Sequence, residues 1–516
     1  MINIYINNIK VLVERNTTVL QACTSVKIEI PKFCFQENLG IAGNCRMCLV
    51  EVANSPKPIA ACAMPVFDQM RIYTNTPLVK KARESILEFL LINHPLDCPI
   101  CDQGGECDLQ DQTLYFGSTT SRFTELKRTV EDKYCGPFIK TIMTRCIHCT
   151  RCVRFTNEIC GIDNLGTTGR GNHMEISFYI NKIFQSEFSG NVIDLCPVGA
   201  LTAKQFAFNV RPWELSKIKT IDILDSLGSN IIIQTFQNKI VRILPKLTAG
   251  LNIEWITDKT RFFFDSLVSQ RLKEPMIKQN GHFVPITWEK AFHLIESKKS
   301  SIDPSQQKFL VGNLIDIKSL YSLKNIITSM GVQSVEYTTL YNNATVDGQR
   351  IHNYKFMTPL KNFEEVDLCL LVLCDPRKEG ALLNLNLRTA VNKNNLKILS
   401  IGANVDLTYP VINLGLSLQI LIHLLEGKHD VCKAILQANT FSILLGPNVY
   451  KIKNYQDVIP LLKKKFMVNL LNFESGFLNY SELFKTKPQI NNNPQLLFLY
   501  NTDNVNIKRS LFNIYI

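Results

Sequence analysis

The cysteines of this 516-residue chain are gathered in its first two fifths, and this distribution limits what the chain can fold into more than any other feature. Fourteen of the 17 lie between Cys23 and Cys196, and only Cys369, Cys374 and Cys432 follow. At about 150 residues per domain, the length allows three or four domains with their own apolar cores and without disulfide bonds. The clustered thiols therefore predict a chemical role for the first two fifths.

The start of the chain, Met-Ile-Asn-Ile-Tyr-Ile, resembles neither an export signal nor an Arg- and Ser-rich import sequence. We therefore expect a reducing compartment, which is either a bacterial cytosol or the interior of an organelle that makes the chain itself. The most apolar uncharged stretch, 407–425, contains Pro410, Asn413 and Gln419. This composition favours a strand followed by an amphipathic helix over a membrane span.

The net charge of +12 belongs almost entirely to the later part of the chain. Residues 1–210 carry a net charge of +1, whereas residues 211–516 carry +11. The lysines there are scattered, with only short runs such as Lys463-Lys464-Lys465, and no basic block contains interleaved aromatic residues. This pattern indicates a solvated face and argues against nucleic-acid binding.

The N-terminal residues predict a small β-grasp domain. Residues 2–13 form two short alternating segments around Asn7-Asn8, which is a hairpin signal, and residues 17–26 form a helix capped by Thr17 or Thr18. A longer helix is predicted for residues 77–93. Its apolar stripe would consist of Leu78, Ala82, Ile86, Phe89, Leu90 and Asn93.

Residues 94–212 are irregular and rich in Cys and Gly, so something other than apolar burial must order them. From about residue 216 the chain becomes β-rich, as in 230–234, and then alternates buried strands with helices such as 380–392. This alternation predicts an α/β layered domain. The predicted buried strands lie at 309–312, 366–373, 396–401 and 496–500.

The first cysteine set is Cys34, Cys45, Cys48 and Cys62, placed around a loop that contains Gly43. Four thiolates that converge from one loop and a distant position suit a [2Fe–2S] cluster, and the glycine lets backbone N–H groups approach the sulfur atoms. Two spaced cysteine pairs can also bind zinc. The spacing favours the cluster and leaves zinc as the alternative.

The second set follows the helix of residues 77–93 and consists of His94, Cys98, Cys101 and Cys107. One imidazole and three thiolates can hold a [4Fe–4S] cluster, and the Cys-Pro and Gly-Gly elements of this loop favour one. Zinc bound by Cys₃His is the alternative, as is a histidine that only caps the helix.

The third set, Cys146, Cys149, Cys152 and the remote Cys196, has the most specific pattern. Ferredoxin runs of the form C-x2-C-x2-C-x3-C-P lend their fourth cysteine to another cluster, but here that position is Thr156. Cys196, which precedes a proline, therefore completes one [4Fe–4S] site. His148 is more consistent with a supporting or surface role than with ligation. Six cysteines are left as structural residues: Cys23, Cys135, Cys160, Cys369, Cys374 and Cys432.

In this order, the motifs resemble the large iron–sulfur subunit of respiratory complex I, NADH:ubiquinone oxidoreductase. Segments outside the cysteine sets, among them 211–215, 242–245 and 254–261, also look like that subunit. The resemblance implies an α+β iron–sulfur region, with a β-grasp [2Fe–2S] ferredoxin-like domain at 1–77, a His/Cys-ligated [4Fe–4S] domain at 78–117 and a [4Fe–4S] ferredoxin-like domain at 118–215. A molybdopterin-oxidoreductase-like α/β domain at 216–516, truncated at its C-terminus, would follow.

The resemblance also assigns ligands to three clusters. Carried over by position, the first set would hold one [2Fe–2S] cluster, and the second and third sets one [4Fe–4S] cluster each. No catalytic residue and no molybdopterin are expected on the chain. A neutral histidine in place of a thiolate should make its cluster easier to reduce.

The function implied by the resemblance is electron transfer within complex I, which couples it to proton translocation. Electrons would arrive from NADH through the flavin-bearing, NADH-binding subunit and leave toward ubiquinone through the quinone-proximal iron–sulfur subunits. The implied location is the peripheral arm on the matrix side of the mitochondrial inner membrane, with synthesis inside the organelle. The alternative location is the cytoplasmic face of a bacterial inner membrane.

Two departures from the family pattern bear on this expectation. No cysteine lies between Cys196 and Cys369, which predicts no fourth cluster and argues against a molybdenum enzyme. The α/β domain stops early, at Ile516, so a separate chain would complete it or the missing layer is dispensable. An iron–sulfur subunit of an NAD-linked hydrogenase or formate dehydrogenase is the alternative function, and a zinc-stapled scaffold is the non-redox alternative.

Overall fold

A computed structural model describes most of the chain. The chain divides into two compact units. The first unit comprises residues 1–218 and 233–243, and the second comprises residues 219–232 and 244–516. Within these, the structure describes residues 1–178, 184–224, 227–248, 254–268, 271–312, 314–337, 356, 360–451, 455–471, 483–484, 494–500, 502 and 512–515. Each unit has apolar cores of its own.

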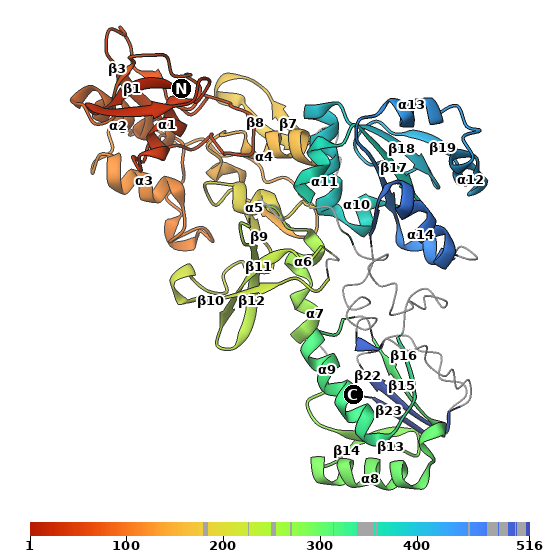
Figure 1. The fold of residues 1–516 in the computed structure, drawn as a ribbon. Coiled ribbons are helices and arrows are strands. Elements are labelled where there is room, and N and C mark those ends of the chain that lie inside the picture. The colour runs from red at the N-terminus through yellow and green to blue at the C-terminus, as the bar shows by residue number, and fades with distance from the viewer. Residues whose placement is uncertain are drawn as a thin grey trace. The chain divides into compact units, whose positions relative to one another are not determined.

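The first unit begins with the β-grasp sheet that the sequence predicts (Figure 1). Its strand order is β2-β1-β5-β3-β4, with β1 and β5 parallel. Asn7 and Asn8 both have positive φ, as a two-residue hairpin turn requires. The strands are β1 (Ile2–Ile6), β2 (Ile9–Val13), β3 (Leu49–Val52), β4 (Ile59–Ala60) and β5 (Arg71–Tyr73).

Helix α1 (Val19–Ser25) packs its apolar side into the core of this sheet. Thr18, one of the two predicted caps, accepts a hydrogen bond from the Gln21 N–H, and the Gln21 side chain accepts one from the Thr18 N–H. This reciprocal capping box satisfies two backbone donors at the start of the helix. The helix prediction is therefore confirmed, and Thr18 is the cap.

Helix α2 (Pro77–Leu91) ends two residues before the predicted limit, and its predicted apolar stripe is only partly right: Ile86 and Leu90 pack against the core, but other members do not. Leu78 and Phe89 are 52% and 75% exposed, whereas Val79, Arg83 and Leu87 are buried. The buried face follows the i, i+4, i+8 spacing, but a charged residue occupies its middle position. Because α2 packs on β3 and on α3 (Asp108–Phe116), the Arg83 guanidinium is covered on that side.

The cysteine-rich part of the first unit consists of short elements, as the sequence predicts. Its apolar core is small and includes Phe33, Leu87 and Val198 packed around several of the candidate ligand cysteines. The antiparallel pair β6–β9 holds two distant segments together. The elements are β6 (Ile139–Thr141), α4 (Arg151–Arg154), β7 (Leu165–Thr168), β8 (Glu175–Phe178), α5 (Asn191–Leu195) and β9 (Leu201–Ala203).

A three-stranded sheet confirms the β-rich texture predicted from residue 216 onward. Its order is β10-β11-β12, and β11 contains the predicted segment 230–234. The strands are β10 (Ser216–Ile221), β11 (Asn230–Phe236) and β12 (Lys239–Pro245), followed by the short helices α6 (Asp258–Phe262) and α7 (Phe264–Val268).

The second unit contains two parallel sheets, which confirms the predicted α/β class. One has the order β16-β15-β22-β23 and the other β19-β18-β17-β20-β21. Strands β15 and β17 are buried at every residue, as expected for sheets covered on both faces. The strands are β15 (Gln307–Val311), β16 (Ser334–Tyr337), β17 (Leu368–Val372), β18 (Lys397–Ile401), β19 (Ile412–Gly415), β20 (Phe441–Leu445), β21 (Met467–Leu470), β22 (Leu496–Tyr500) and β23 (Phe512–Tyr515).

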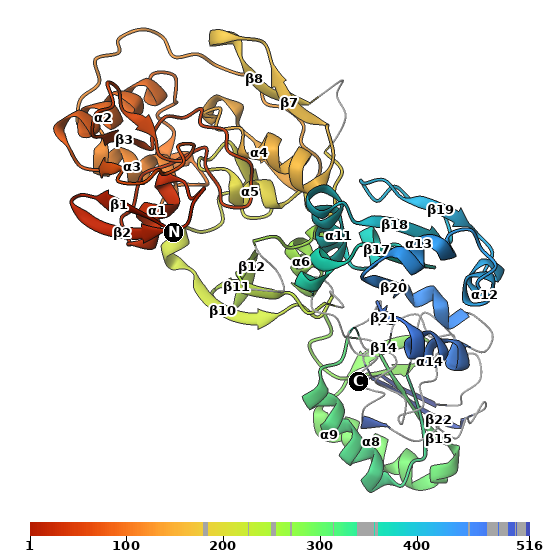
Figure 2. The same cartoon turned by 45° about the horizontal axis from the view of Figure 1, so that its top comes forward.

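Helices separate these strands along the chain, and α11 and α14 lie beside the sheet of β17 in both views (Figures 1 and 2). Residues 407–425 form strand β19 and a helix of seven residues, as the sequence predicts. Among the described helices, none combines the length and the apolar composition that a membrane span needs. The helices are α8 (Trp288–Ser301), α9 (Ile317–Met330), α10 (Pro376–Glu379), α11 (Ala381–Asn394), α12 (Gln419–Leu425), α13 (Cys432–Gln437) and α14 (Tyr455–Lys465); the hairpin β13 (Met276–Gln279) and β14 (His282–Pro285) precedes α8.

Candidate iron–sulfur sites

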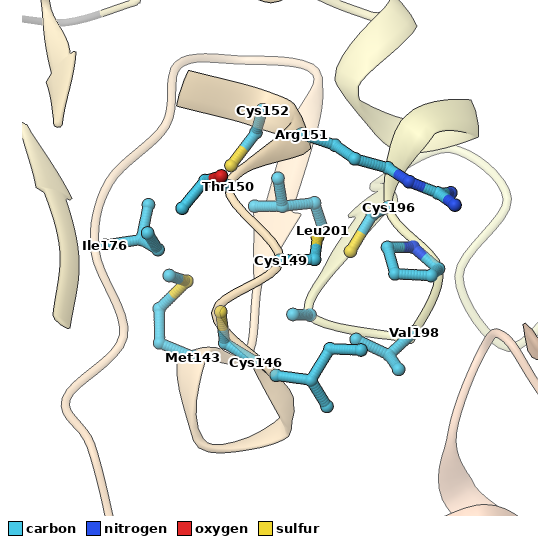
Figure 3. A pocket seen from close by; sticks show the side chains of 13 residues that line it. Met143, Cys146, Cys149, Thr150, Arg151, Cys152, Ile176, Cys196, Val198 and Leu201 are labelled. Carbon is cyan, nitrogen blue, oxygen red and sulfur yellow. The ribbon is translucent and has the colours of Figure 1, made fainter. Parts of the chain in front are cut away.

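The structure brings the third cysteine set together around one small cavity. Cys146, Cys149, Cys152 and Cys196 all line it (Figure 3). Strand pairing explains the remote contribution, because β6 and β9 are antiparallel and the Ile142 N–H donates to the Ala200 carbonyl at 2.9 Å. The segment before Cys146 and the segment after Cys196 are thereby held side by side.

The loop from Cys146 to Cys152 is coiled so that its cysteines reach the same cavity. His148 and Thr150 have φ values of 54° and 60°, in the left-handed region, and the His148 N–H donates to Cys146 Sγ at 3.4 Å. Backbone N–H groups that donate to sulfur stabilise thiolates. The His148 side chain does not line the cavity, so its supporting role stays a prediction.

The chemistry of this cavity fits a metal cluster bound by thiolates. Burial raises the pKa of Cys146 to about 12 and the pKa of Cys149 to about 11, and it also raises the pKa values of Cys152 and Cys196. The apolar lining therefore disfavours four free thiolates unless a cation compensates them. Iron would provide that compensation, and its binding would release the thiol protons.

The first set is also assembled. Cys48 directly precedes β3 and Cys62 follows β4, and the β3–β4 pairing places the Ala61 N–H 3.1 Å from the Cys48 carbonyl oxygen. The Cys34 N–H donates to Cys45 Sγ at 3.4 Å. Hydrogen bonds from the Cys45 and Cys62 thiols lower the pKa of Cys34, and the same contacts raise the pKa values of Cys45 and Cys62. The thiols of this set are thus in mutual contact.

The second set is only partly brought together. His94 lies just beyond α2, Cys98 is exposed in a 3₁₀ turn, and Cys101 and Cys107 are buried, with Cys107 at the start of α3. The cavity at the third set is lined by none of these four side chains. In none of the three sets does the described part of the chain place three His, Cys, Asp or Glu side chains around a single metal ion.

Two observations nevertheless indicate that the second set is suited to binding a metal group. The His94 Nδ1 is buried and has no hydrogen-bond partner among the described residues, as a nitrogen reserved for a metal would. Burial, and then the charges of Arg145 and Lys127, lower the pKa of His94 to about 4. The imidazole is therefore neutral at pH 7, which is the form that binds metals.

The second and third sets share the loop that follows Cys196. The Asp108 N–H donates to the Pro197 carbonyl at 3.1 Å, and Cys107 Sγ lies 3.7 Å from the same oxygen. A Cβ atom at Gly199 would lie 2.3 Å from Cys101 Sγ. Only glycine leaves room there for the sulfur atom, so this loop positions residues of both sets.

Arginines join the three sets, although no motif in the sequence marks them. Arg151 donates to the Phe35 carbonyl at 3.1 Å, beside Cys34, and to the Leu195 carbonyl at 3.3 Å, beside Cys196. Arg154 donates to the Cys34 carbonyl and, at 3.4 Å, to the Cys149 carbonyl. These residues hold the loops of the first and third sets in a fixed relation.

The loop of the second set is held in the same way. Arg211 donates to the carbonyls of Pro99 and Cys101, both at 2.6 Å, and Arg145 donates to Asp97 at 3.0 Å. The sequence gives one hint of these arginines: basic residues alternate with candidate ligand cysteines from Arg145 to Arg154. Nothing in that pattern says which carbonyl each arginine would reach.

The six cysteines outside the three sets have varied surroundings. Cys23, Cys135, Cys160 and Cys369 are buried, and Cys374 and Cys432 are partly buried. Burial raises the pKa of Cys369 to about 12 and the pKa of Cys23 to about 11. These two thiols are neutral at pH 7, which agrees with the structural role predicted for them.

Comparison with protein families gives five matches along the chain. In chain order they are a 2Fe-2S iron-sulfur cluster binding domain (1–77), the NADH-ubiquinone oxidoreductase-G iron-sulfur binding region (83–122), the ferredoxin-like domain of NADH-quinone oxidoreductase subunit 3 (136–202), the NDSU1/NuoG-like 4Fe-4S domain (215–265) and the molybdopterin oxidoreductase family (271–509). Residues 215–265 contain no cysteine, so this fourth match adds no thiolate. The fold and these matches define an iron–sulfur oxidoreductase subunit with a molybdopterin-oxidoreductase-like domain.

Individual relatives identify the family. The NADH-ubiquinone oxidoreductase 75 kDa subunit of Reclinomonas americana is 50% identical over 478 residues, which are 90% of this chain and 69% of the relative. The mitochondrial NADH dehydrogenase [ubiquinone] iron-sulfur protein 1 of Solanum tuberosum is 46% identical over 87% of this chain and 61% of its own length. A subunit of the NADH-quinone oxidoreductase of Rickettsia felis is 45% identical over 90% of this chain and 69% of its own length. The chain belongs to this family of complex I subunits.

The family resemblance and the fold class expected from the sequence are thereby confirmed. The chain spans about two thirds of the length of these relatives. A solved NAD+-reducing [NiFe]-hydrogenase in the H2-reduced state aligns with 41% of this chain and 90% of its own, at 25% identity and a TM-score of 0.38. That score is too low to support an argument from structure.

Proposed function

We propose that this chain relays electrons within an NADH:ubiquinone oxidoreductase, from the flavin-bearing subunit toward quinone. The observation that carries the proposal is the buried cavity lined by the four cysteines of the third set. The Cys34–Cys62 set is tied to that region by the backbone-binding arginines Arg151 and Arg154. Redox groups held in this way suit a relay, and no substrate needs to react on the chain.

The ligand assignments belong to the same proposal. Cys34, Cys45, Cys48 and Cys62 hold one [2Fe–2S] cluster. Two [4Fe–4S] clusters are held by His94, Cys98, Cys101 and Cys107 and by Cys146, Cys149, Cys152 and Cys196. We propose no molybdopterin. We also propose domain limits at residues 77, 117 and 215; the family match that ends at 77 supports the first of them, and the match that begins at 215 supports the last.

The clusters, when bound, supply the one-electron chemistry, and the residues of this chain control it. The His148 and Cys34 N–H groups donate to the Sγ atoms of Cys146 and Cys45, which lowers the charge density on those thiolates. Apolar residues such as Met143, Ile147 and Ile176 line the third site and exclude water. The arginines Arg151 and Arg154 hold the loops of the first and third sets together.

The proposed partners are the other complex I subunits, in particular the NADH-binding flavin subunit and the quinone-proximal iron–sulfur subunits. We place the protein in the peripheral arm on the matrix side of the mitochondrial inner membrane, where the complex couples electron transfer to proton translocation. The mitochondrial relative from Solanum tuberosum supports this location over a bacterial cytoplasmic face, although Rickettsia felis has a related subunit.

Iron and sulfide analysis of the anaerobically purified full-length chain tests the proposal. We expect about ten iron atoms and about ten sulfides per chain, from one binuclear and two tetranuclear clusters. Replacing Cys152 by Ser should lower the count by about four of each, because a tetranuclear cluster loses a ligand, whereas the same change at Cys135, outside the three sets, should leave it unchanged. Stoichiometric zinc without sulfide would establish the scaffold alternative and end the redox proposal.

A further inference from the structure

Arg145 directly precedes a ligand of the third set, but its side chain extends to the second set. It is only 2% exposed. Its Nε donates to Asp97 Oδ2 at 3.0 Å, and its Nη2 lies 3.0 Å from the same oxygen. Asp97 immediately precedes Cys98, so the guanidinium is anchored at the loop that carries two of the proposed cluster ligands.

The third nitrogen of this guanidinium is buried and without a partner. Among the residues that the structure describes, none accepts a hydrogen bond from Arg145 Nη1. A buried cationic donor without an acceptor is costly, and proteins rarely keep one unless a bound group supplies the acceptor. An acidic or sulfur-rich prosthetic group beside Arg145 would supply it.

The surroundings of Arg145 show which group that would be. A Cβ atom built on Gly199 would lie 2.3 Å from Cys101 Sγ and 3.7 Å from Arg145 Cδ, so both side chains border the same small space. The charge of Arg145 also acts on the His94 imidazole. Arg145 therefore faces two of the four proposed ligands of the second set.

Other charged groups near this set already have partners. Lys127 Nζ donates to the carbonyls of Leu91 and Ile92, both at 2.8 Å. Asp102 pairs with Lys140 at 3.3 Å. Asp97 offsets part of the Arg145 charge, but its side chain is 30% exposed, so water screens the carboxylate more than the buried guanidinium.

We propose that Arg145 is a positioning residue for the cluster held by His94, Cys98, Cys101 and Cys107, and that it raises the reduction potential of that cluster. This inference rests on the proposed function. With three thiolates and a neutral imidazole, the cluster carries a charge of about −1 when oxidised and about −2 when reduced. A fixed buried cation with a free N–H donor stabilises the more negative state more strongly.

The test is an EPR-monitored redox titration of the full-length, cluster-loaded chain and its Arg145→Gln variant. The signal of the second-set cluster is identified by its loss in His94→Ala. In Arg145→Gln we expect the equilibrium constant for its reduction to fall at least tenfold, which is about 59 mV for a one-electron couple. Arg145→Lys should recover most of the shift, and the equilibrium constant of the binuclear cluster should change by less than about threefold.

Two further variants separate this role from a merely structural one. Asp97→Asn removes a negative charge and the partner of Arg145, and Asp97 makes no side-chain capping hydrogen bond in its turn. In this variant the potential of the second-set cluster should therefore shift upward, opposite to Arg145→Gln. Arg122→Gln removes an equally paired but exposed guanidinium, whose side chain is 81% exposed, and should leave the potential unchanged.

The outcomes that overturn the inference are distinct from those that overturn the function. Full iron content with an unshifted potential in Arg145→Gln contradicts the proposed role. If that variant loses iron, Asp97→Asn decides, and an unchanged or lowered potential there contradicts it equally. A wild-type chain that holds no cluster at the second set refutes the proposed function itself, and this inference with it.

Discussion

At the scale of single residues, the candidate ligands can be recognised from the sequence, whereas the side chains that hold their loops in place cannot. Cysteines and one histidine at metal-binding spacing can be recognised along the chain, because the spacing reflects the geometry of the metal group. The arginines that join the loops have no such spacing. Arg151 reaches the Phe35 carbonyl across 116 positions of sequence, and only the packing of the cysteine-rich loops brings the two together.

His94 and His148 form a matched pair of histidines, one a predicted ligand and the other a predicted non-ligand, and replacing each tests the assignment. Replacing His94 by Ala should alter or abolish one tetranuclear EPR signal and leave the binuclear signal intact, because its unpartnered Nδ1 marks it as a ligand position. Replacing His148 by Ala should preserve all signals, because its side chain does not line the third cavity. The opposite pattern would exchange the two assignments, and an unchanged spectrum in His94→Ala would make His94 a helix-terminal residue only.

At the scale of elements, most predicted helices and strands lie where periodicity and capping place them. Helix α11 begins one residue after its predicted start and β17 lies within the predicted segment, because their apolar patterns persist over several residues. Helix α2 shows where apolar periodicity fails. Its buried face contains Arg83, whose guanidinium lies over the Phe116 ring and donates to the Leu49 carbonyl. A long charged side chain that buries its stem is missed when only apolar residues are counted.

Glu379, the last residue of helix α10, should make the stability of the fold depend on pH. Burial raises the pKa of Glu379 to about 7, and its carboxylate accepts the Asp375 N–H at 2.9 Å. Because the folded pKa lies above the unfolded value of about 4.3, the folded chain binds more protons between these values. The contribution of Glu379 to stability is therefore complete below about pH 4.3 and is lost as the pH rises through about 7, by at most about 4 kcal/mol.

The Glu379→Gln variant should remove this dependence. Thermal unfolding measured between about pH 5 and 8 should show a smaller decline of stability with pH than in the wild type, and the variant should be the more stable protein at the upper end. Glu364→Gln changes an exposed carboxylate of the same unit and should keep the wild-type slope. Equal slopes for all three proteins would show that Glu379 is ionised like an exposed carboxylate.

At the scale of the whole molecule, the two units are ordered by different interactions. The second unit has extensive apolar cores on both faces of the β17 sheet. The cysteine-rich part of the first unit has a small core in which candidate ligand cysteines take the place of aliphatic side chains. Metal binding to such a region supplies folding free energy that apolar burial does not.

Limited proteolysis should reveal this difference. After iron is removed with chelator and oxidant, we expect trypsin to cleave first between Arg122 and Lys133, a described stretch without helix or strand. Lys127 and Arg128 are tied there to neighbouring carbonyls, and those contacts depend on the order of the second and third sets. Mass spectrometry should find the second unit still intact at that stage. Cleavage at equal rates with and without iron would show that the clusters do not order this region.

Local patterns along the chain are enough to define the class of this protein. Ligand spacing, strand alternation and capping predict the three cysteine sets, the β-grasp hairpin and the α/β alternation, because each depends on residues close together in sequence. The tertiary fold, in contrast, selects which distant segments meet: the pairing of β6 with β9, the Gly199 loop against Cys101, and the carbonyls that each arginine reaches. These contacts depend on the packing of the whole unit, because a long charged side chain can bind any of many backbone oxygens, and the sequence does not distinguish among them.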